Sequence, residues 1–189
     1  MSRERELLCL TPAATNHQHM IIQLSNTMKI SILATVTLLA PLGFMASAYA
    51  YDPQDLAQLK RTNACPRCDL SNAPLNNLNL SRADLRNANL QGANLSRSIL
   101  MGADLSSANL ATANISSANL VNATLVGANL NSATLINANL TGAGLMAANL
   151  EAANFKGANM DLVNSRGARF QLTIMPNGIV SPLDPSWLR

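Results

Sequence analysis

The chain has 189 residues, of which 48% are hydrophobic, 3% are aromatic and 12% are charged, and its formal net charge is +3. This length corresponds to one domain or two. A charged fraction about half of the usual ~25% argues against a disordered chain, and the scarcity of aromatic residues argues against an ordinary globular core. The small, scattered net charge provides no basic stripe for a phosphate backbone, so nucleic acid is not an expected partner.

Residues 28–50 are predicted to be a secretory signal peptide. An uncharged apolar run over 30–40 follows Lys29, and Ala48-Tyr49-Ala50 has the small-x-small pattern that signal peptidase reads. Pro41 interrupts the apolar stretch, which is short for a membrane span of ~20 residues. We therefore expect cleavage after Ala50, export of the chain, and no membrane association afterwards.

Residues 1–27 do not fit the start of a signal peptide, because they contain Glu4, Glu6 and a polar stretch. We expect Met28 to be the true start, which makes 1–27 a mis-assigned leader. A longer leader or an uncleaved anchor is the alternative. With cleavage after Ala50, the mature chain keeps Cys65 and Cys68 and contains no histidine.

Residues 51–65 are expected to form an N-terminal cap. Asp52 is a residue type that caps helices, and Pro53 is accepted in the first helical turn. Leu56 and Leu59 would then share one helix face. The pattern predicts a short capping helix over 53–61.

Residues 66–170 repeat with a period of five. From Leu70 onward every fifth residue is Leu or a substitute, 16 of 21 being Leu, and 17 of the 21 residues two positions earlier are Ala. A five-residue step would wind the Leu around an α-helix and alternate it between the faces of a strand. The chain must therefore turn between consecutive Leu, and the Gly and Asn residues three positions before many of them tolerate such turns. The period predicts an all-β solenoid.

This pattern resembles the pentapeptide-repeat family, whose motif A-(D/N)-L-x-x is nearly undiluted in SSANLATANISSANL over 106–120. The resemblance implies a right-handed quadrilateral β-helix with four pentapeptides per coil, and hence about five coils. Exported members from cyanobacteria and plastid lumens also pair a signal sequence with a short helix and a C-x-x-C-D-L motif. The resemblance thus implies a periplasmic or thylakoid-lumen location.

Residues 171–189 are expected to form a C-terminal cap or tail, because the period dissolves after Phe170. Pro176-Asn177-Gly178 predicts a turn, and the apolar residues on either side suit a lid folded over the last coil. These apolar residues are Leu172, Ile174, Ile179 and Val180.

Cys65-Pro66-Arg67-Cys68 is the one motif with distinctive chemistry. A C-x-x-C pair can be a redox centre, half of a zinc site or a structural disulfide. Zinc prefers four ligands, and the mature chain has no other Cys or His, so no metal or cofactor is expected. Export to an oxidising compartment favours a disulfide between Cys65 and Cys68, with a redox-responsive switch as the alternative.

No catalytic residues are predicted, because a serine nucleophile needs an activating base and the mature chain lacks histidine. One wall of the solenoid, with Asp84, Asp104, Thr124, Gly144 and Asn164 before its Leu positions, lacks the Asn ladder of the others. Outward apolar residues flank it in pairs one coil apart. They are Met101 with Val121, and Val126 with Met146.

These four residues are the candidate partner surface, because clustered exposed apolar residues often mark contacts. The predicted function is a non-enzymatic exported scaffold that binds an unknown protein. The alternative is a thiol-redox accessory acting through Cys65 and Cys68. A gyrase-binding DNA mimic, known in the family, is disfavoured because 105–150 contains no charged residue.

Overall fold

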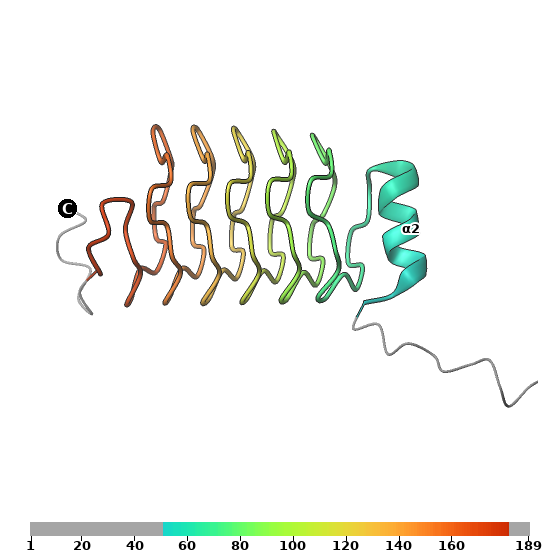
Figure 1. The fold of residues 1–189 in the computed structure, drawn as a ribbon, viewed down its shortest axis with the longest axis horizontal. Helices are drawn as coiled ribbons and strands as arrows, with labels where there is room; N and C mark the ends of the chain where they lie inside the picture. Colours follow the sequence, from blue (N-terminus) through green and yellow to red (C-terminus); the bar gives the residue numbers. More distant parts are fainter. Residues whose placement is uncertain (1–50, 182–189) are drawn as a thin grey trace, which may run out of the picture. The chain divides into compact units, whose positions relative to one another are not determined.

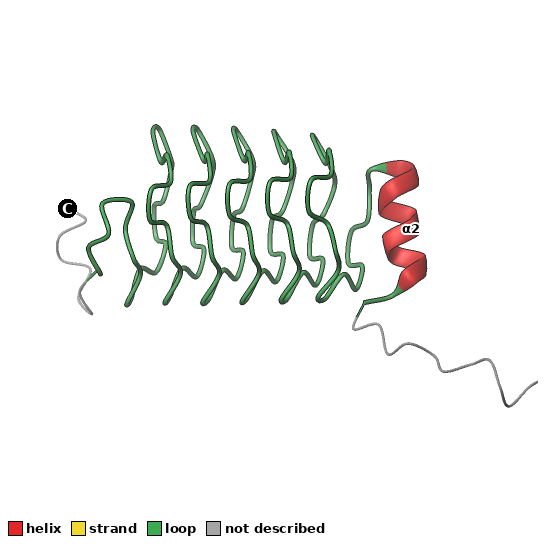
Figure 2. Cartoon of the chain, viewed as in Figure 1, coloured by secondary structure: helices red, strands yellow, loops and turns green. Residues whose placement is uncertain are grey.

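The computed structural model describes residues 51–181. The predicted leader, the predicted signal peptide and residues 182–189 of the predicted C-terminal cap lie outside the described residues. Figure 1 shows helix α2, Pro53–Thr62, beside a stack of similar coils that succeed one another along the chain. Apart from α2, the described residues form turns and isolated β-bridges, so Figure 2 draws them as loop. No helix among these residues has the length and hydropathy needed to span a bilayer.

The coils repeat every 20 residues. Parallel bridges join each residue that precedes a Leu position to the residue 20 positions later, beginning with Ala64–Asp84 and ending with Asn154–Ile174. Four pentapeptides therefore make one coil, as the family resemblance implied. Because only one residue per wall and coil forms a bridge, the extended segments are shorter than strands.

The core contains the two positions that the period identified. The Leu positions from Leu70 to Leu150 are at most 3% exposed, and most of the Ala positions are equally buried. Phe155 occupies a Leu position and is also fully buried. Burying a Leu contributes about 1.5–3 kcal/mol, which each coil obtains only by stacking on its neighbours.

Backbone hydrogen bonds explain why the coils stay in register. In the pentapeptide ending at Leu90, the Asn87 and Leu90 amides donate to the following coil at 2.9 and 2.7 Å. The Asn89 amide donates to the preceding coil at 2.9 Å, and the Ala88 amide bonds across the corner to Leu85 at 3.1 Å. Four of the five amides are thus satisfied within the backbone.

Every fifth residue from Arg67 to Leu172 has a positive φ. The sequence predicted this conformation for Gly and Asn, but Arg, Ser, Thr, Ala and Leu adopt it too at the same turn position. A non-glycine residue there costs roughly 1–2 kcal/mol. From Arg67 to Gly157 the inter-coil hydrogen bond made by each turn residue offsets that cost, so the register overrides local preference there.

Helix α2 begins and ends as its sequence indicates. The Asp52 side chain accepts from the Gln54 amide at 2.8 Å, Pro53 occupies the first turn, and Asn63 ends the helix in the left-handed conformation. Leu56 and Leu59 are buried and belong to the same apolar cluster as the coil residues.

The repeat geometry extends beyond both predicted limits. Cys65 is fully buried, and its backbone amide donates to the Asp84 carbonyl at 2.7 Å, as the amides at the Leu positions do to the following coil. At the other end, Thr173 and Met175 take the Ala and Leu positions of one more pentapeptide, and Ile174 bridges Asn154. The period therefore persists in the backbone after the sequence motif has ended.

The turn predicted at Pro176-Asn177-Gly178 is present, but the apolar packing predicted around it is wrong. The Met175 amide donates to Ile179 at 2.8 Å, and Ile174 pairs with Val180 in an antiparallel bridge. Polar contacts hold this hairpin, since Ser181 is buried and its amide donates to Thr173 at 2.7 Å. Leu172, Ile179 and Val180 are more than half exposed.

Candidate functional site

The four residues of the candidate partner surface lie at the two corners beside one wall. This wall is called the Thr124 wall, after the residues that precede its Leu positions (Asp84, Asp104, Thr124, Gly144 and Asn164). The Gly102 amide donates to Val121 and the Gly127 amide to Met146, each at 2.9 Å. These bonds place Met101 one coil from Val121 at one corner, and Val126 one coil from Met146 at the other.

The two methionines are the more exposed members of this set. Met101 is 43% and Met146 is 38% exposed, whereas Val121 and Val126 are half-buried. Ile99, which the sequence analysis did not select, is 40% exposed and lies two residues before Met101. Ile99 stands where the motif has Asn, and this departure from the motif is the sequence feature that could have identified it as part of the apolar surface. Ile99 extends the apolar surface onto the adjoining wall.

The Asn or Asp before a Leu position has a local function throughout the solenoid. Its side-chain oxygen accepts from the amide two residues later, as Asn94 does from Ser96 and Asn119 does from Val121, at 3.1 and 3.2 Å. This bond satisfies the fifth amide of the pentapeptide. Asn and Asp are suited to such turns because their side chains are short.

Three residues of the candidate surface lack this local acceptor. Ile99, Thr124 and Gly144 stand where the motif has Asn or Asp, and they precede Met101, Val126 and Met146 respectively. The backbone amides of Met101, Val126 and Met146 have no hydrogen-bond partner among residues 51–181. Ile136, after Thr134 on the opposite wall, has the same arrangement. Each such position therefore combines an outward apolar side chain with an available backbone donor.

The neighbouring wall, called the Asn129 wall, shows the opposite character. Its side chains form a ladder in which Asn89, Asn109, Asn129 and Asn149 each donate to the residue one coil earlier, over 3.0–3.3 Å. The ladder pairs each amide side chain along the wall. Among the described residues the ladder forms on the Asn129 wall alone, so the ladder predicted for the two remaining walls is wrong, and its absence does not distinguish the Thr124 wall from them.

The N-terminal end of the Thr124 wall is charged. Arg86 donates from Nε and Nη2 to both carboxylate oxygens of Asp84, at 2.8 and 2.7 Å, and this bonding holds the pKa of Asp84 below its ordinary value. Its Nε also lies 3.8 Å from Asp104. One guanidinium thus lies beside both stacked carboxylates in a partly exposed group of charges.

Cys65 and Cys68 form a disulfide across the first corner, with their Cα atoms 5.4 Å apart. Cys65 stands at a Leu position and Cys68 at the next Ala position, and both are buried. The Cys68 amide bonds to the Cys65 carbonyl at 3.4 Å, as the Ala73 amide bonds to Leu70 at the following corner. The backbone makes the same turn at corners that have no disulfide.

Asp55 of α2 joins this cysteine pair. One ligand atom from each of Asp55, Cys65 and Cys68 lies within 4.8 Å of the others. Cys65 Sγ is 3.2 Å from the Asp55 carbonyl oxygen, and Asp55 Oδ2 accepts from the Asp69 amide at 2.7 Å. Asp55 could not be selected from the sequence, because only the packing of α2 brings it to a cysteine pair that begins ten residues later.

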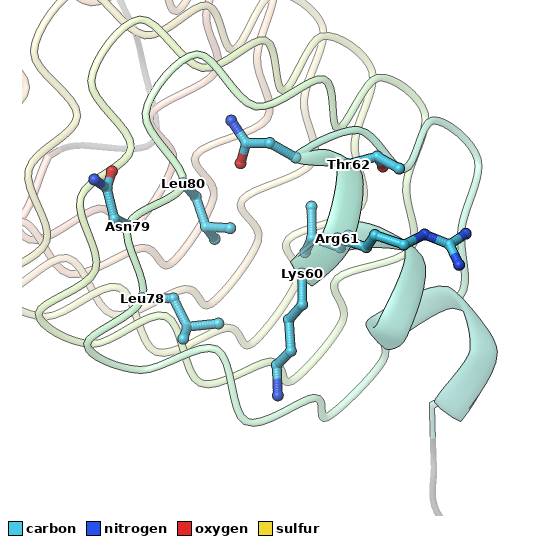
Figure 3. A pocket seen from close by; sticks show the side chains of 8 residues that line it. Lys60, Arg61, Thr62, Leu78, Asn79 and Leu80 are labelled. Atoms are coloured by element: carbon cyan, nitrogen blue, oxygen red, sulfur yellow. The ribbon is translucent and has the colours of Figure 1, made fainter.

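A shallow hollow separates the C-terminal end of α2 from the nearest coil (Figure 3). Leu78 and Leu80 form its apolar side, and Lys60 and Arg61 of α2 lie across from them. Leu78 stands at a position where the motif has Ala. The lining residues include no His, Asp or Glu.

Comparisons with known proteins agree with the repeat geometry. The family of pentapeptide repeats matches in 8 copies, over residues 67–102, 79–116 and 108–145. The solved pentapeptide repeat protein Rfr23, from the cyanobacterium Cyanothece 51142, is 34% identical over 64% of this chain and 93% of its own, with a TM-score of 0.60. No curated protein matches the chain at a significant level.

Two further solved structures are similar over shorter parts. HetL, a pentapeptide repeat protein involved in heterocyst differentiation regulation in Nostoc sp. strain PCC 7120, is 33% identical over 62% of this chain and 64% of its own, with a TM-score of 0.31. A pentapeptide repeat protein of the Arabidopsis thaliana thylakoid lumen is 26% identical over 40% of this chain and 59% of its own, with a TM-score of 0.28.

Proposed function

Because the chain belongs to the pentapeptide-repeat family, we propose that it is a non-enzymatic exported scaffold that docks a partner protein on the Thr124 wall. Proteins of this family fold as right-handed quadrilateral β-helices and are generally non-enzymatic. The proposal of export is supported by the signal-like sequence over 28–50. A flat wall of a rigid solenoid suits binding better than chemistry.

The proposed scaffold has about five coils, with α2 as its N-terminal cap. The period of 20 residues and the 21 sequence repeats support the coil number. The burial of Leu56 and Leu59 in the shared apolar cluster supports the cap. A solenoid needs such covers because its end coils otherwise leave core side chains and backbone groups exposed.

The observation that carries the docking proposal is the pairing of apolar side chains with available amides. At Met101, Val126 and Met146, the motif's Asn or Asp is missing, and the residue presents both an outward apolar side chain and an N–H group. A partner with oxygen acceptors beside apolar groups would satisfy both features. The partner's carbonyl or carboxylate oxygens would take the place of the missing side-chain acceptor.

The test restores the missing acceptors. Thr124→Asn and Gly144→Asn would give the Val126 and Met146 amides the local acceptor that other pentapeptides have. A Cβ built at Gly144 has no atom within 4 Å, so the substitution fits the fold. We expect both variants to be at least as stable as the natural chain and to lose partner binding. Binding is measured by photo-cross-linking from a benzophenone amino acid placed at Met101.

Thr134→Asn is the matched control, since it restores the same acceptor to Ile136 on the opposite wall. We expect it to leave the cross-linked product unchanged. Equal cross-linking in the Gly144→Asn and Thr134→Asn chains would contradict the docking proposal. So would a cross-linked product of the same yield when the benzophenone is moved to Ser116, beside the opposite wall.

A thiol-redox role for Cys65 and Cys68 is the second candidate. It is favoured by one observation, namely that the backbone makes the same corner wherever Ala replaces Cys68. The disulfide is therefore not needed to form the turn. Thiol titration under graded reductant tests this role, and a pair that stays unreactive at the compartment's potential would exclude it. A gyrase-binding role remains disfavoured by the uncharged stretch over 105–150.

A further inference from the structure

The cluster of Asp55, Cys65 and Cys68 contains the donor set of a metal site. Two sulfur atoms and a carboxylate oxygen lie within 4.8 Å of one another, in a part of the chain where both cysteines are buried. Zinc binds thiolate sulfur at about 2.3 Å and carboxylate oxygen at about 2.0–2.2 Å, usually with tetrahedral geometry. Two such zinc–sulfur bonds place the sulfur atoms about 3.8 Å apart.

That sulfur separation is compatible with the observed backbone. The Cα atoms of Cys65 and Cys68 are 5.4 Å apart, so opening the disulfide needs side-chain rotation and no change of the corner. The same corner forms without a disulfide at Leu70 and Ala73. The turn that holds the two sulfur atoms is therefore expected to persist in the reduced chain.

Asp55 is held in place independently of the disulfide. Its Oδ2 accepts from the Asp69 amide at 2.7 Å, and the Asp52 amide donates to the Asp69 carbonyl at 3.0 Å. These bonds fix the first turn of α2 on the first coil. An outer contact of this kind orients a metal-binding carboxylate and improves its affinity for the ion. The positive end of the ten-residue helix also favours the anionic ligands.

We propose that reduction of the Cys65–Cys68 disulfide creates a zinc site formed by Cys65, Cys68 and Asp55. A dithiol reductant gives two electrons to the disulfide and becomes a disulfide itself, and the two protein sulfurs become thiols. Zn²⁺ then displaces the two thiol protons to solvent and binds both thiolates, the Asp55 carboxylate and one water. A disulfide oxidant that takes two electrons from the thiolates is reduced to a dithiol, re-forms the Cys65–Cys68 bond and releases Zn²⁺, so the disulfide and the metal exclude each other. This inference does not depend on docking at the Thr124 wall.

Zinc binding by the full chain with Cys9→Ser tests the proposal. The chain is kept either oxidised or reduced with a water-soluble phosphine, and Zn²⁺ affinity is measured by competition with a chromophoric chelator. We expect one tightly bound Zn²⁺ per reduced chain and none of that affinity in the oxidised chain. Binding by His17 and His19 would be the same in both forms, so it does not contribute to the difference.

Asp55→Asn distinguishes the folded site from an isolated cysteine pair. The amide oxygen of Asn can still accept from the Asp69 amide, so the fold is kept while the carboxylate is lost. We expect Zn²⁺ affinity of the reduced chain to fall at least about tenfold, and Cys68→Ser to abolish the site. Asp84→Asn, an acid-to-amide change on the Thr124 wall, should leave the affinity unchanged.

Three results would overturn the proposal. They are equal Zn²⁺ affinity in the oxidised and reduced chains, an Asp55→Asn affinity within twofold of the natural one, and no Zn²⁺ bound by the reduced chain. Circular dichroism of each variant establishes that the solenoid remains folded. Because the Asp55→Asn chain retains its disulfide when oxidised, its fold can be assessed before reduction.

Discussion

At the residue scale, the Asn before each Leu position has two roles that the repeat motif does not separate. Its oxygen accepts from the amide two residues later, and on the Asn129 wall its nitrogen also donates to the preceding coil. The first role satisfies a local backbone group and the second links coils. Different walls thus use the same residue with different numbers of bonds.

Asn129→Ala should destabilise the chain more than Asn119→Ala. Asn129 donates to Asn109 and accepts from Asn131 and Asn149, whereas Asn119 accepts only from Val121. At about 0.5–1.5 kcal/mol per net hydrogen bond, the two lost ladder bonds should cost at least about 1 kcal/mol more. Urea unfolding measures the difference, and equal midpoints would show that the ladder contributes nothing.

Gly142→Ala should destabilise the chain more than Gly127→Ala. Both glycines have a positive φ, of 70° and 65°, so both substitutions carry the same backbone cost of roughly 1–2 kcal/mol. At Gly142 the added Cβ would also collide with Asn122 Oδ1, while at Gly127 the nearest atom is Ser107 Oγ at 3.6 Å. We expect a further loss of about 1 kcal/mol from displacing Asn122.

Combining Gly142→Ala with Asn122→Ala provides the control for that collision. Ala at position 122 has no oxygen for the new methyl group to meet, so the two substitutions should be less than additive. Thermal or urea unfolding of the four chains completes the cycle. Full additivity would mean that the Asn122 side chain and the methyl group added at position 142 are not coupled.

At the element scale, α2 owes its place to a few side chains. Leu59 is 1% exposed and is the most buried residue of the helix. Leu59→Ala should cost about 2–5 kcal/mol, because it leaves a cavity between the helix and the first coil. Leu162→Ala is the matched control, since Leu162 is 88% exposed and should lose less than about 0.5 kcal/mol. Similar losses in both variants would contradict this packing.

The sequence predicts these elements unevenly, and the reason is physical. Leu70, Ala73 and their repeats could be assigned to the core because a period of five leaves them no other common face. Asp52 and Pro53 likewise predict the start of α2. The exposure of Ile179 and Val180 was not predicted, because polar bonds of Thr173 and Ser181 hold the hairpin in place of apolar burial.

The candidate sites show the same limit. Met101 and Met146 could be selected because their positions follow from the period alone. Asp55 could not, because its contact with Cys65 depends on how α2 packs against the first coil. The available amides at Val126 and Met146 were also missed, since the local role of the preceding Asn becomes visible only from the hydrogen bonds.

At the scale of the whole molecule, the 20-residue register predicts how deletions behave. Removing residues 111–130 joins Leu110 to Asn131 and deletes one coil, so each remaining side chain keeps its wall. Removing only 111–115 moves every later residue to the next wall, and Thr134 then follows Asn109 in the ladder. Repeat proteins lose stability in proportion to the interfaces removed, so both chains should still fold.

The five-residue deletion should nevertheless lose the ladder on the Asn129 wall beyond Asn109. We expect Asn109→Ala to cost about 0.5–1.5 kcal/mol less in that chain than in the chain lacking 111–130, because Asn149 continues the ladder after Asn109 in the latter, whereas Thr134, which has no side-chain amide, follows it in the former. Urea midpoints of the parent and substituted chains measure both costs. Equal costs would mean that side chains pair along the wall irrespective of register.

The hairpin at the C-terminal end reverses the direction of the chain, and this reversal bears on self-association. Every bridge between coils is parallel, but Ile174 pairs with Val180 in the antiparallel sense. A second molecule that extended this wall end to end would have to pair its backbone with Ile174. Val180 already pairs with Ile174, so the growth of a filament is blocked there. Fibres should therefore appear in a chain cut after Pro176 before they appear in the intact one.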